Sequence, residues 1–122
     1  MSYGKSISID LHGCNADDFT RRKLRQFVLA LCDYIKMTPA KRVWWDYRWS
    51  PWAKREAPAH LKGTSLVQFI QTSTIVIHTL DDLGTVYIDL FSCSTFSATD
   101  VIYFCKNWFG GKVVNHSITE RF

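Results

Sequence analysis

Residues 65–93 constrain the fold of this 122-residue chain most strongly, because they hold three strand-like segments with almost no chain left for loops. The first two segments, Ser65–Gln71 and Thr74–Leu80, are rich in apolar residues and follow one another nearly directly. A turn sequence, Asp81-Asp82-Leu83-Gly84, then leads into the third segment, Thr85–Cys93. Strands with such short connections pair antiparallel. We therefore expect a three-stranded antiparallel meander.

The chain on either side of this meander carries further strand and helix patterns. Apolar residues recur at helical spacing between Asp17 and Met37, with Asn15 or Asp17 available to cap the helix. Ser97-Ala98-Thr99-Asp100 has the spacing of a capping box before a second helical stripe, and Gly110-Gly111 ends that stripe. The remaining patterned segments are typical of strands: Lys5–Leu11, Arg42–Trp49 and Lys112–Thr119.

These patterns together predict an α+β fold in the order β-α-β-β-β-α-β. Both helices need an apolar face to cover, so we expect a two-layer α/β sandwich with two helices on one face of an antiparallel sheet. A chain of 122 residues without an internal repeat is the size of one domain, and we expect residues 1–122 to form it.

The cysteines and the N-terminal residues indicate a reducing compartment. The chain has four cysteines, but its first ten residues lack the apolar core of a secretion signal. No apolar run approaches the roughly 20 residues that a membrane-spanning helix needs. We therefore expect reduced thiols, a cytoplasmic location and no membrane partner.

The basic charge is concentrated between Lys41 and Lys62. This segment has six basic and two acidic residues, and the rest of the chain is balanced at nine of each sign. It also holds four of the five tryptophans. Basic residues interleaved with aromatic ones are found in nucleic-acid-binding surfaces. A solvated loop whose aromatic side chains fold back on the core is commoner, so we regard a nucleic-acid partner as the weaker interpretation.

Ser73 stands at the junction of the first two strands of the meander, where a chemical role and a structural role are both open. A strained turn can hold a serine hydroxyl against the preceding carbonyl, although serine is also a favoured turn residue. His78 is five residues further along, and an odd offset in a strand changes face. Periodicity therefore places His78 beside Ser73 only if Ser73 belongs to the turn. Cys93 ends the third strand and can lie near both, although a single buried histidine or cysteine more often fills a core.

Metal and phosphate motifs are missing from the sequence. The four histidines are scattered, and neither a C-x-x-C nor an H-E-x-x-H pattern occurs. The glycines match neither the Walker pattern nor the dinucleotide-binding pattern. We therefore expect no metal cofactor.

Two runs of the meander carry a family resemblance. Thr72–Gly84 reads TSTIVIHTLDDLG, and Asp89–Cys93 reads DLFSC. They resemble the prokaryotic S-adenosylmethionine decarboxylase family, whose members cleave their own chain at a serine to create a pyruvoyl cofactor. The family stretch runs Glu-Ser-His-hydrophobic-x-Ile-His-Thr-Trp-Pro-Glu-x-Gly, followed by a strand that ends Asp-hydrophobic-Phe-Thr-Cys. The spacings from serine to histidine and from serine to cysteine agree without a gap.

The likeness extends over nearly the whole chain, apart from a basic insertion at about Trp52–Lys62 that continues the tryptophan-rich segment. Five short motifs outside the meander's two runs correspond to family features: Gly4-Lys5, His12-Gly13-Cys14, Trp49-Ser50-Pro51, Gly63-Thr64-Ser65-Leu66 and Glu120-Arg121. The serine of the fourth motif stands eight residues ahead of Ser73, as it does in the family.

The resemblance implies a role for each residue of the processing reaction. Ser73 would attack the carbonyl of Thr72, which converts the peptide bond to an ester and cleaves the chain between Thr72 and Ser73. His78 would remove the α-proton in the elimination that follows, and Ser65 would hydrogen-bond the reacting groups. Hydrolysis would then leave a pyruvoyl group at position 73.

The resemblance also implies how the mature enzyme acts. The pyruvoyl ketone would form an imine with the substrate amine and draw electrons from the departing carboxylate. Cys93 would return a proton to the product carbon. Trp49 occupies the position of an aromatic residue that stacks on adenine, and Asp82 occupies that of a glutamate that binds the ribose hydroxyls.

The expected function is therefore a self-processing decarboxylase of S-adenosylmethionine for polyamine synthesis, acting as a homodimer. Both neighbours of Ser73 depart from the family pattern, since Thr72 replaces glutamate and Thr74 replaces histidine. Arginine or ornithine is an alternative substrate. A second alternative is a homologue that does not cleave and instead binds a ligand, another protein or nucleic acid.

Overall fold

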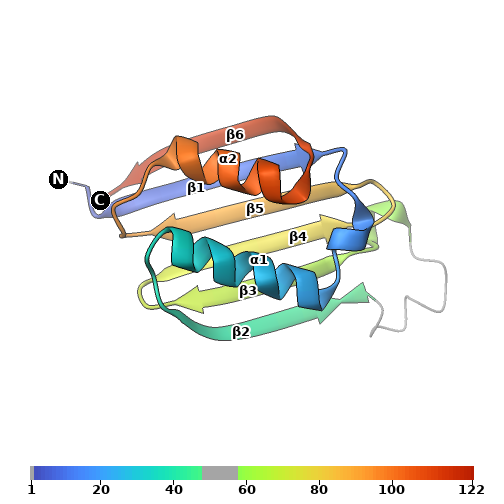
Figure 1. Cartoon of the computed structure of the whole chain (residues 1–122), viewed down its shortest axis with the longest axis horizontal. Coiled ribbons are helices and arrows are strands. Elements are labelled where there is room, and N and C mark those ends of the chain that lie inside the picture. The colour runs from blue at the N-terminus through green and yellow to red at the C-terminus, as the bar shows by residue number, and fades with distance from the viewer. Residues whose placement is uncertain (1, 48–57) are drawn as a thin grey trace.

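The computed structural model describes residues 2–47 and 58–122, which form a six-stranded sheet with two α-helices against it (Figure 1). The spatial order of the strands is β2-β3-β4-β5-β1-β6, and neighbouring strands pair antiparallel. The strands are β1 (Gly4–His12), β2 (Pro39–Asp46), β3 (Thr64–Ile70), β4 (Ser73–Leu80), β5 (Thr85–Ser92) and β6 (Lys112–Arg121). The α-helices are α1 (Arg21–Tyr34) and α2 (Ala98–Phe109), and short 3-10 turns lie at Ala16–Asp18 and Ala59–Leu61.

The predicted fold class is confirmed, and the predicted order of elements is wrong by one strand. Both helices cover the same face of one antiparallel sheet, as expected for a two-layer sandwich (Figure 1). Four consecutive strands, β2 to β5, separate the helices, whereas the order β-α-β-β-β-α-β contains three there. The fourth strand there is β2, which corresponds to the strand expected at Arg42–Trp49; it pairs with β3 and so extends the meander by one strand.

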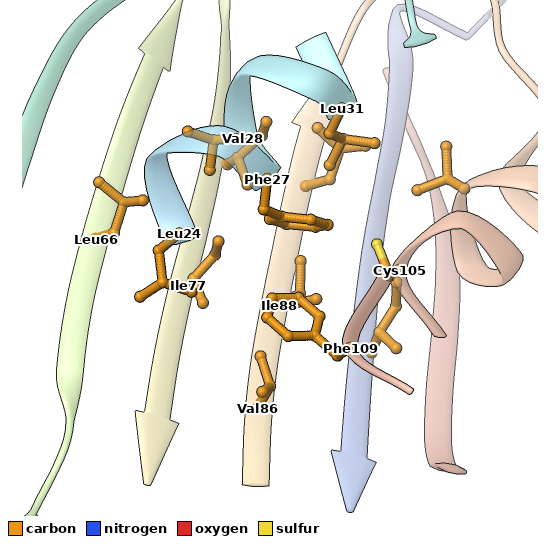
Figure 2. Packing of buried hydrophobic residues seen from close by; sticks show 14 of the residues in the cluster. Leu24, Phe27, Val28, Leu31, Leu66, Ile77, Val86, Ile88, Cys105 and Phe109 are labelled. Atoms are coloured by element: carbon orange, nitrogen blue, oxygen red, sulfur yellow. The ribbon is translucent and has the colours of Figure 1, made fainter. Parts of the chain in front are cut away.

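The apolar faces of both helices meet the apolar side chains of the sheet. Leu24, Phe27, Val28 and Leu31 of α1 lie over Ile77 and its neighbours in the central strands (Figure 2). The ring of Phe27 is fully buried, and its centroid is 4.8 Å from that of Phe109 in α2. Burying a side chain of this size contributes about 1.5–3 kcal/mol to folding. This shared core fixes the sheet on which the candidate site stands.

The helix ends agree only in part with the predictions. Ser97 caps α2 by accepting a hydrogen bond from the backbone N–H of Asp100, and Gly110 ends that helix with a positive φ of 67°. Helix α1 begins at Arg21, later than expected, and Thr20 is its N-cap. Asn15 caps the short 3-10 turn at Ala16–Asp18 instead, because that turn interrupts the helical run ahead of α1.

The β3–β4 connection is the tightest turn of the meander. Gln71 and Thr72 form the turn itself, and Ser73 is the first residue of β4, paired with Ile70 of β3. Thr72 has a φ of +61°. A β-branched residue is uncommon in this left-handed region, and such a conformation costs on the order of 1–3 kcal/mol.

Candidate active site

The predicted reactive residues occupy two separate places on the sheet. In β4 the side chains alternate, so that Ser73 is buried on the helix-covered face and His78 is exposed on the other. We call that other side the open face; it carries Ser65, Val67 and Phe69 of β3, Thr74, Val76 and His78 of β4, and Tyr87, Asp89 and Phe91 of β5. Five residues of strand span about 17 Å. Ser73 and His78 of one chain are therefore too far apart to react together.

Ser73 belongs to a chain of hydroxyl groups beneath the sheet. It is 4% exposed, and its Oγ donates to Ser92 Oγ over 3.2 Å. The backbone N–H of Ser94 also donates to Ser92 Oγ, at 3.0 Å, and Ser94 Oγ in turn donates to the carbonyl of Ile35 after α1. These bonds hold the hydroxyl of Ser73 at the start of β4, next to the peptide bond that joins it to Thr72.

Cys93 lies against the other side of the same turn. Its Sγ is 3.2 Å from Thr72 Oγ1. Thr72 precedes Ser73 and Cys93 follows Ser92, so the contact between the two serines continues to their chain neighbours. The hydrogen bond from Thr72 lowers the pKa of the Cys93 thiol, partial desolvation raises it, and smaller contributions from Tyr3, the Cys93 backbone and Ser73 lower it. The net effect is a pKa below the ordinary value, which favours the thiolate of Cys93 in the uncleaved chain.

Ser65 and His78 form the second group, at the opposite end of β4. They are direct cross-strand partners, and Ser65 Oγ is 2.7 Å from Nδ1 of His78. Gly63 and Thr64 lock this register, because the Thr64 N–H donates to Thr79 Oγ1 and a side chain at Gly63 would collide with the Thr79 carbonyl. The Ser65–His78 hydrogen bond orients the imidazole of His78.

A hollow of about 470 Å³ adjoins the Ser65–His78 pair. Trp45, Ser65, His78 and Tyr87 stand opposite one another across β2 to β5, so an exposed aromatic residue flanks the pair on each side. The side chain of Trp45 is 69% exposed and that of Tyr87 37%. Both residues line the hollow, together with Tyr47 and His60. A planar ring would find π-surface on both sides of His78.

The two predicted substrate-binding residues have different outcomes. Trp49 lies outside the described residues, as does most of the predicted insertion at 52–62, of which residues 58–62 are described. Asp82 stands in the β4–β5 turn and forms an ion pair with Lys62, with Oδ2 and Nζ 3.3 Å apart. This turn is at the Ser65–His78 end of the sheet, since it follows Leu80.

The structure also shows neighbours of the candidate residues that the sequence did not single out. Ser92 holds Ser73, and Trp45 and Tyr87 flank His78. Tyr87 could have been found from its register with His78 across the short β4–β5 turn. Ser92 gave no signal of its own, because an interior hydroxyl at a strand end is common and its partner depends on the pairing.

Three further features of the described part of the chain concern metal ligands, disulfides and membrane-spanning helices. Across residues 2–47 and 58–122, no three His, Cys, Asp or Glu side chains gather as metal ligands would. All four cysteines are free thiols. In the same residues, no helix is long and apolar enough to cross a membrane.

The chain is similar to known proteins in its family and in its fold. A family model described as S-adenosylmethionine decarboxylase matches residues 5–122. Among solved structures, the adenosylmethionine decarboxylase from Aquifex aeolicus VF5 superposes with a TM-score of 0.77. It is 21% identical over an alignment that covers 98% of this chain and 91% of that one, so the likeness is one of fold. No curated protein sequence matches.

Proposed function

Because the chain belongs to the S-adenosylmethionine decarboxylase family, we propose that it is a self-processing, pyruvoyl-dependent decarboxylase of S-adenosylmethionine that supplies polyamine synthesis in the cytoplasm. The observation that carries this proposal is the turn at Thr72-Ser73. A buried serine hydroxyl follows a residue with a left-handed backbone, and a thiol with a lowered pKa lies against that residue.

The residues around this turn fit a group made from Ser73. Thr72 is exposed and Ser73 is buried in the uncleaved chain, so the C-terminus that cleavage creates can move into solvent and uncover position 73. Ser92 orients the Ser73 hydroxyl, and attack on the carbonyl of Thr72 converts the strained peptide to an ester. The left-handed conformation of Thr72 costs about 1–3 kcal/mol. Cleavage relieves this backbone strain and so favours the reaction by at most that amount.

The mature site needs an electron sink and a proton donor. A pyruvoyl group at position 73 supplies the electron sink for loss of carbon dioxide. Cys93 is the described group placed to return a proton beside position 73, since its Sγ contacts Thr72. His78 is the base we assign to removal of the Ser73 α-proton, with Ser65 holding its imidazole.

This assignment requires a second copy of the chain, because His78 is about 17 Å from Ser73 along β4. We propose a homodimer in which two open faces pack together about a two-fold axis that lies parallel to the sheets and perpendicular to the strands. Such an axis places the Ser73 end of one β4 over the His78 end of the other. The large apolar side chains exposed on the open face support this contact: Val43, Trp45, Phe69 and Tyr87.

In the dimer, the hollow beside His78 would face the partner's position 73. Trp45 and Tyr87 then supply flat surfaces for the adenine ring, and Asp82 lies at the same end of the sheet for the ribose hydroxyls. Asp82 would have to exchange its ion pair with Lys62 for these hydroxyls. The side chains of this ion pair are 28% exposed at Lys62 and 50% exposed at Asp82, so breaking it costs little.

Release of labelled carbon dioxide tests the substrate. The processed protein is incubated with carboxyl-labelled S-adenosylmethionine, arginine or ornithine in separate reactions, and the Ser73→Ala chain is the control. We expect release from S-adenosylmethionine at a rate far above that of the control. Faster release from arginine or ornithine would show that this amino acid is the substrate, and the proposed pyruvoyl chemistry would still hold. Release from none of the three by a processed chain would contradict decarboxylation.

A further inference from the structure

Thr72 makes contacts that the glutamate of the family pattern would not make in the same way. Its Oγ1 lies 3.2 Å from Cys93 Sγ and donates to the carbonyl oxygen of Gln71 over 2.6 Å. A threonine hydroxyl has one proton and can accept as well as donate. Its direction can therefore change with the protonation state of the sulfur.

We propose that Thr72 is a positioning residue for Cys93: in the uncleaved chain its hydroxyl holds the sulfur beside Ser73 and adapts to both the thiol and the thiolate. The biological role of this contact rests on the proposed function, in which Cys93 donates the proton to the product. Its physical content, a hydroxyl that favours the thiolate, holds whether or not the chain is cleaved.

The two states differ in one rotation of the hydroxyl. When the sulfur is protonated, S–H donates to Oγ1 while O–H donates to the Gln71 carbonyl. When it is ionised, O–H turns to the sulfur, and the carbonyl of Gln71, an exposed residue, loses this donor. A hydrogen bond to an ionised acceptor is about twice as strong as one between neutral groups, so the exchange favours the thiolate. The direction agrees with the lowered pKa of Cys93, of which Thr72 is the largest cause.

Charged and titratable groups around Cys93 are engaged elsewhere or act in the same direction. The Tyr3 hydroxyl adds a smaller lowering of the Cys93 pKa. Lys5 Nζ in β1 donates to the Phe96 carbonyl over 3.0 Å, and the Arg121 guanidinium in β6 lies over the Phe91 ring and donates to Ser6 Oγ. Glu120 accepts from Ser2, and Lys36 follows α1 near Phe96. Thr72 is therefore the neighbour whose removal should change the thiol most.

Chain cleavage would reverse the effect. Thr72 then becomes a C-terminal residue with a new carboxylate. Either this carboxylate stays near Cys93, or the whole residue moves away and takes its hydroxyl with it. A nearby negative charge disfavours the thiolate, and loss of the hydrogen bond does the same. Either outcome raises the Cys93 pKa and leaves sulfur in the protonated form that a proton donor needs.

The rate at which iodoacetamide alkylates Cys93, measured as a function of pH, tests the proposal. Three uncleavable chains are compared: Ser73→Ala alone, Ser73→Ala with Thr72→Val, and Ser73→Ala with Thr72→Ser. Valine keeps the β-branched shape without the hydroxyl, and serine keeps the hydroxyl without the methyl. Peptide mapping separates Cys93 from the three buried cysteines, and burial raises the pKa of Cys32 to about 11 and that of Cys105 to about 12. Their continued protection shows that a variant is folded.

We expect the pH profile of the chain with Thr72→Val to move to higher pH, with alkylation of Cys93 slowed by about three- to tenfold near neutral pH. The profile of the chain with Thr72→Ser should match that of the Ser73→Ala chain. Equal profiles for all three chains, or an equal shift in both variants, would overturn the proposal. If valine exposes the buried cysteines, Thr72→Ala replaces it under the same criteria. In cleaved wild-type protein the profile should also lie at higher pH than in the Ser73→Ala chain, and the absence of that shift would overturn the effect of cleavage. The three-chain comparison needs no cleavage, so it remains valid if the proposed function fails.

Discussion

A mixture of two defective chains should restore the processing reaction if the site is shared between protomers. Ser73→Ala lacks the nucleophile but keeps Ser65 and His78, and His78→Ala keeps Ser73 but lacks the base. Ser73 and His78 of one chain lie about 17 Å apart on opposite faces of β4, which no side-chain rotation can span. Each variant alone should therefore form no pyruvoyl-ended fragment, whereas the mixed dimer contains one complete site.

The size of the effect follows from random pairing. Equal amounts of the two chains give about half mixed dimers, and in each of them only the His78→Ala chain can be processed. About half of the His78→Ala chains should therefore yield a fragment that begins with pyruvoyl and carries alanine at position 78. That fragment is lighter by one ammonia than the fragment that simple ester hydrolysis would leave, so intact mass distinguishes the two.

The control is His78→Ala mixed with a chain that carries both substitutions. The doubly substituted chain forms the same dimers but brings no His78, so this mixture should yield no pyruvoyl-ended fragment. Two results would refute the reasoning. One is the absence of the fragment from the first mixture after co-expression, and the other is efficient pyruvoyl formation by His78→Ala alone.

Two further substitutions test the packing that supports the site. Phe27→Ala, made in the uncleavable Ser73→Ala chain, should lower the free energy of unfolding by about 3–5 kcal/mol in chemical denaturation, because the ring is fully buried against α2. Phe122→Ala is the matched control: its ring is 89% exposed, and a loss above about 0.5 kcal/mol there, or none at Phe27, would contradict the described core. Gly4→Ala should slow self-cleavage measured by gel, because its Cβ would lie 2.3 Å from the Ser92 carbonyl oxygen and 2.9 Å from Cys93 Cα. Unchanged cleavage would show that the position of Cys93 and Ser92 relative to the turn does not matter.

The sequence predicted the elements of this fold better than their ends. Apolar alternation in β3 to β5 and the short turns between them determine the pairing, because slipping a strand by one residue would expose its buried side chains. Ser97 and Gly110 marked the ends of α2, since capping depends on local hydrogen bonds and backbone conformation. The start of α1 was misplaced because Asn15 begins a short 3-10 turn, and both kinds of helix favour the same capping residues.

The roles of the candidate site residues stay predictions, and the sequence indicated only part of their arrangement. Alternation correctly indicated that Ser73 and His78 point to opposite faces, and the structure places them at opposite ends of β4 as well. The cross-strand position of Ser65 opposite His78 follows from a register that the sequence alone does not give. The contact between Thr72 and Cys93 depends on the left-handed turn at Thr72, which threonine rarely adopts and which no local pattern indicated.

The intact mass of the purified wild-type chain tests the central claim, that the bond between Thr72 and Ser73 breaks by attack of Ser73. After incubation at neutral pH, the account predicts two species: residues 1–72 with a free carboxylate, and residues 73–122 with a pyruvoyl group in place of the N-terminal serine. The Ser73→Ala chain should remain whole under the same conditions. A wild-type chain that stays whole after prolonged incubation, or one that is cut equally with alanine at position 73, would contradict the pyruvoyl mechanism.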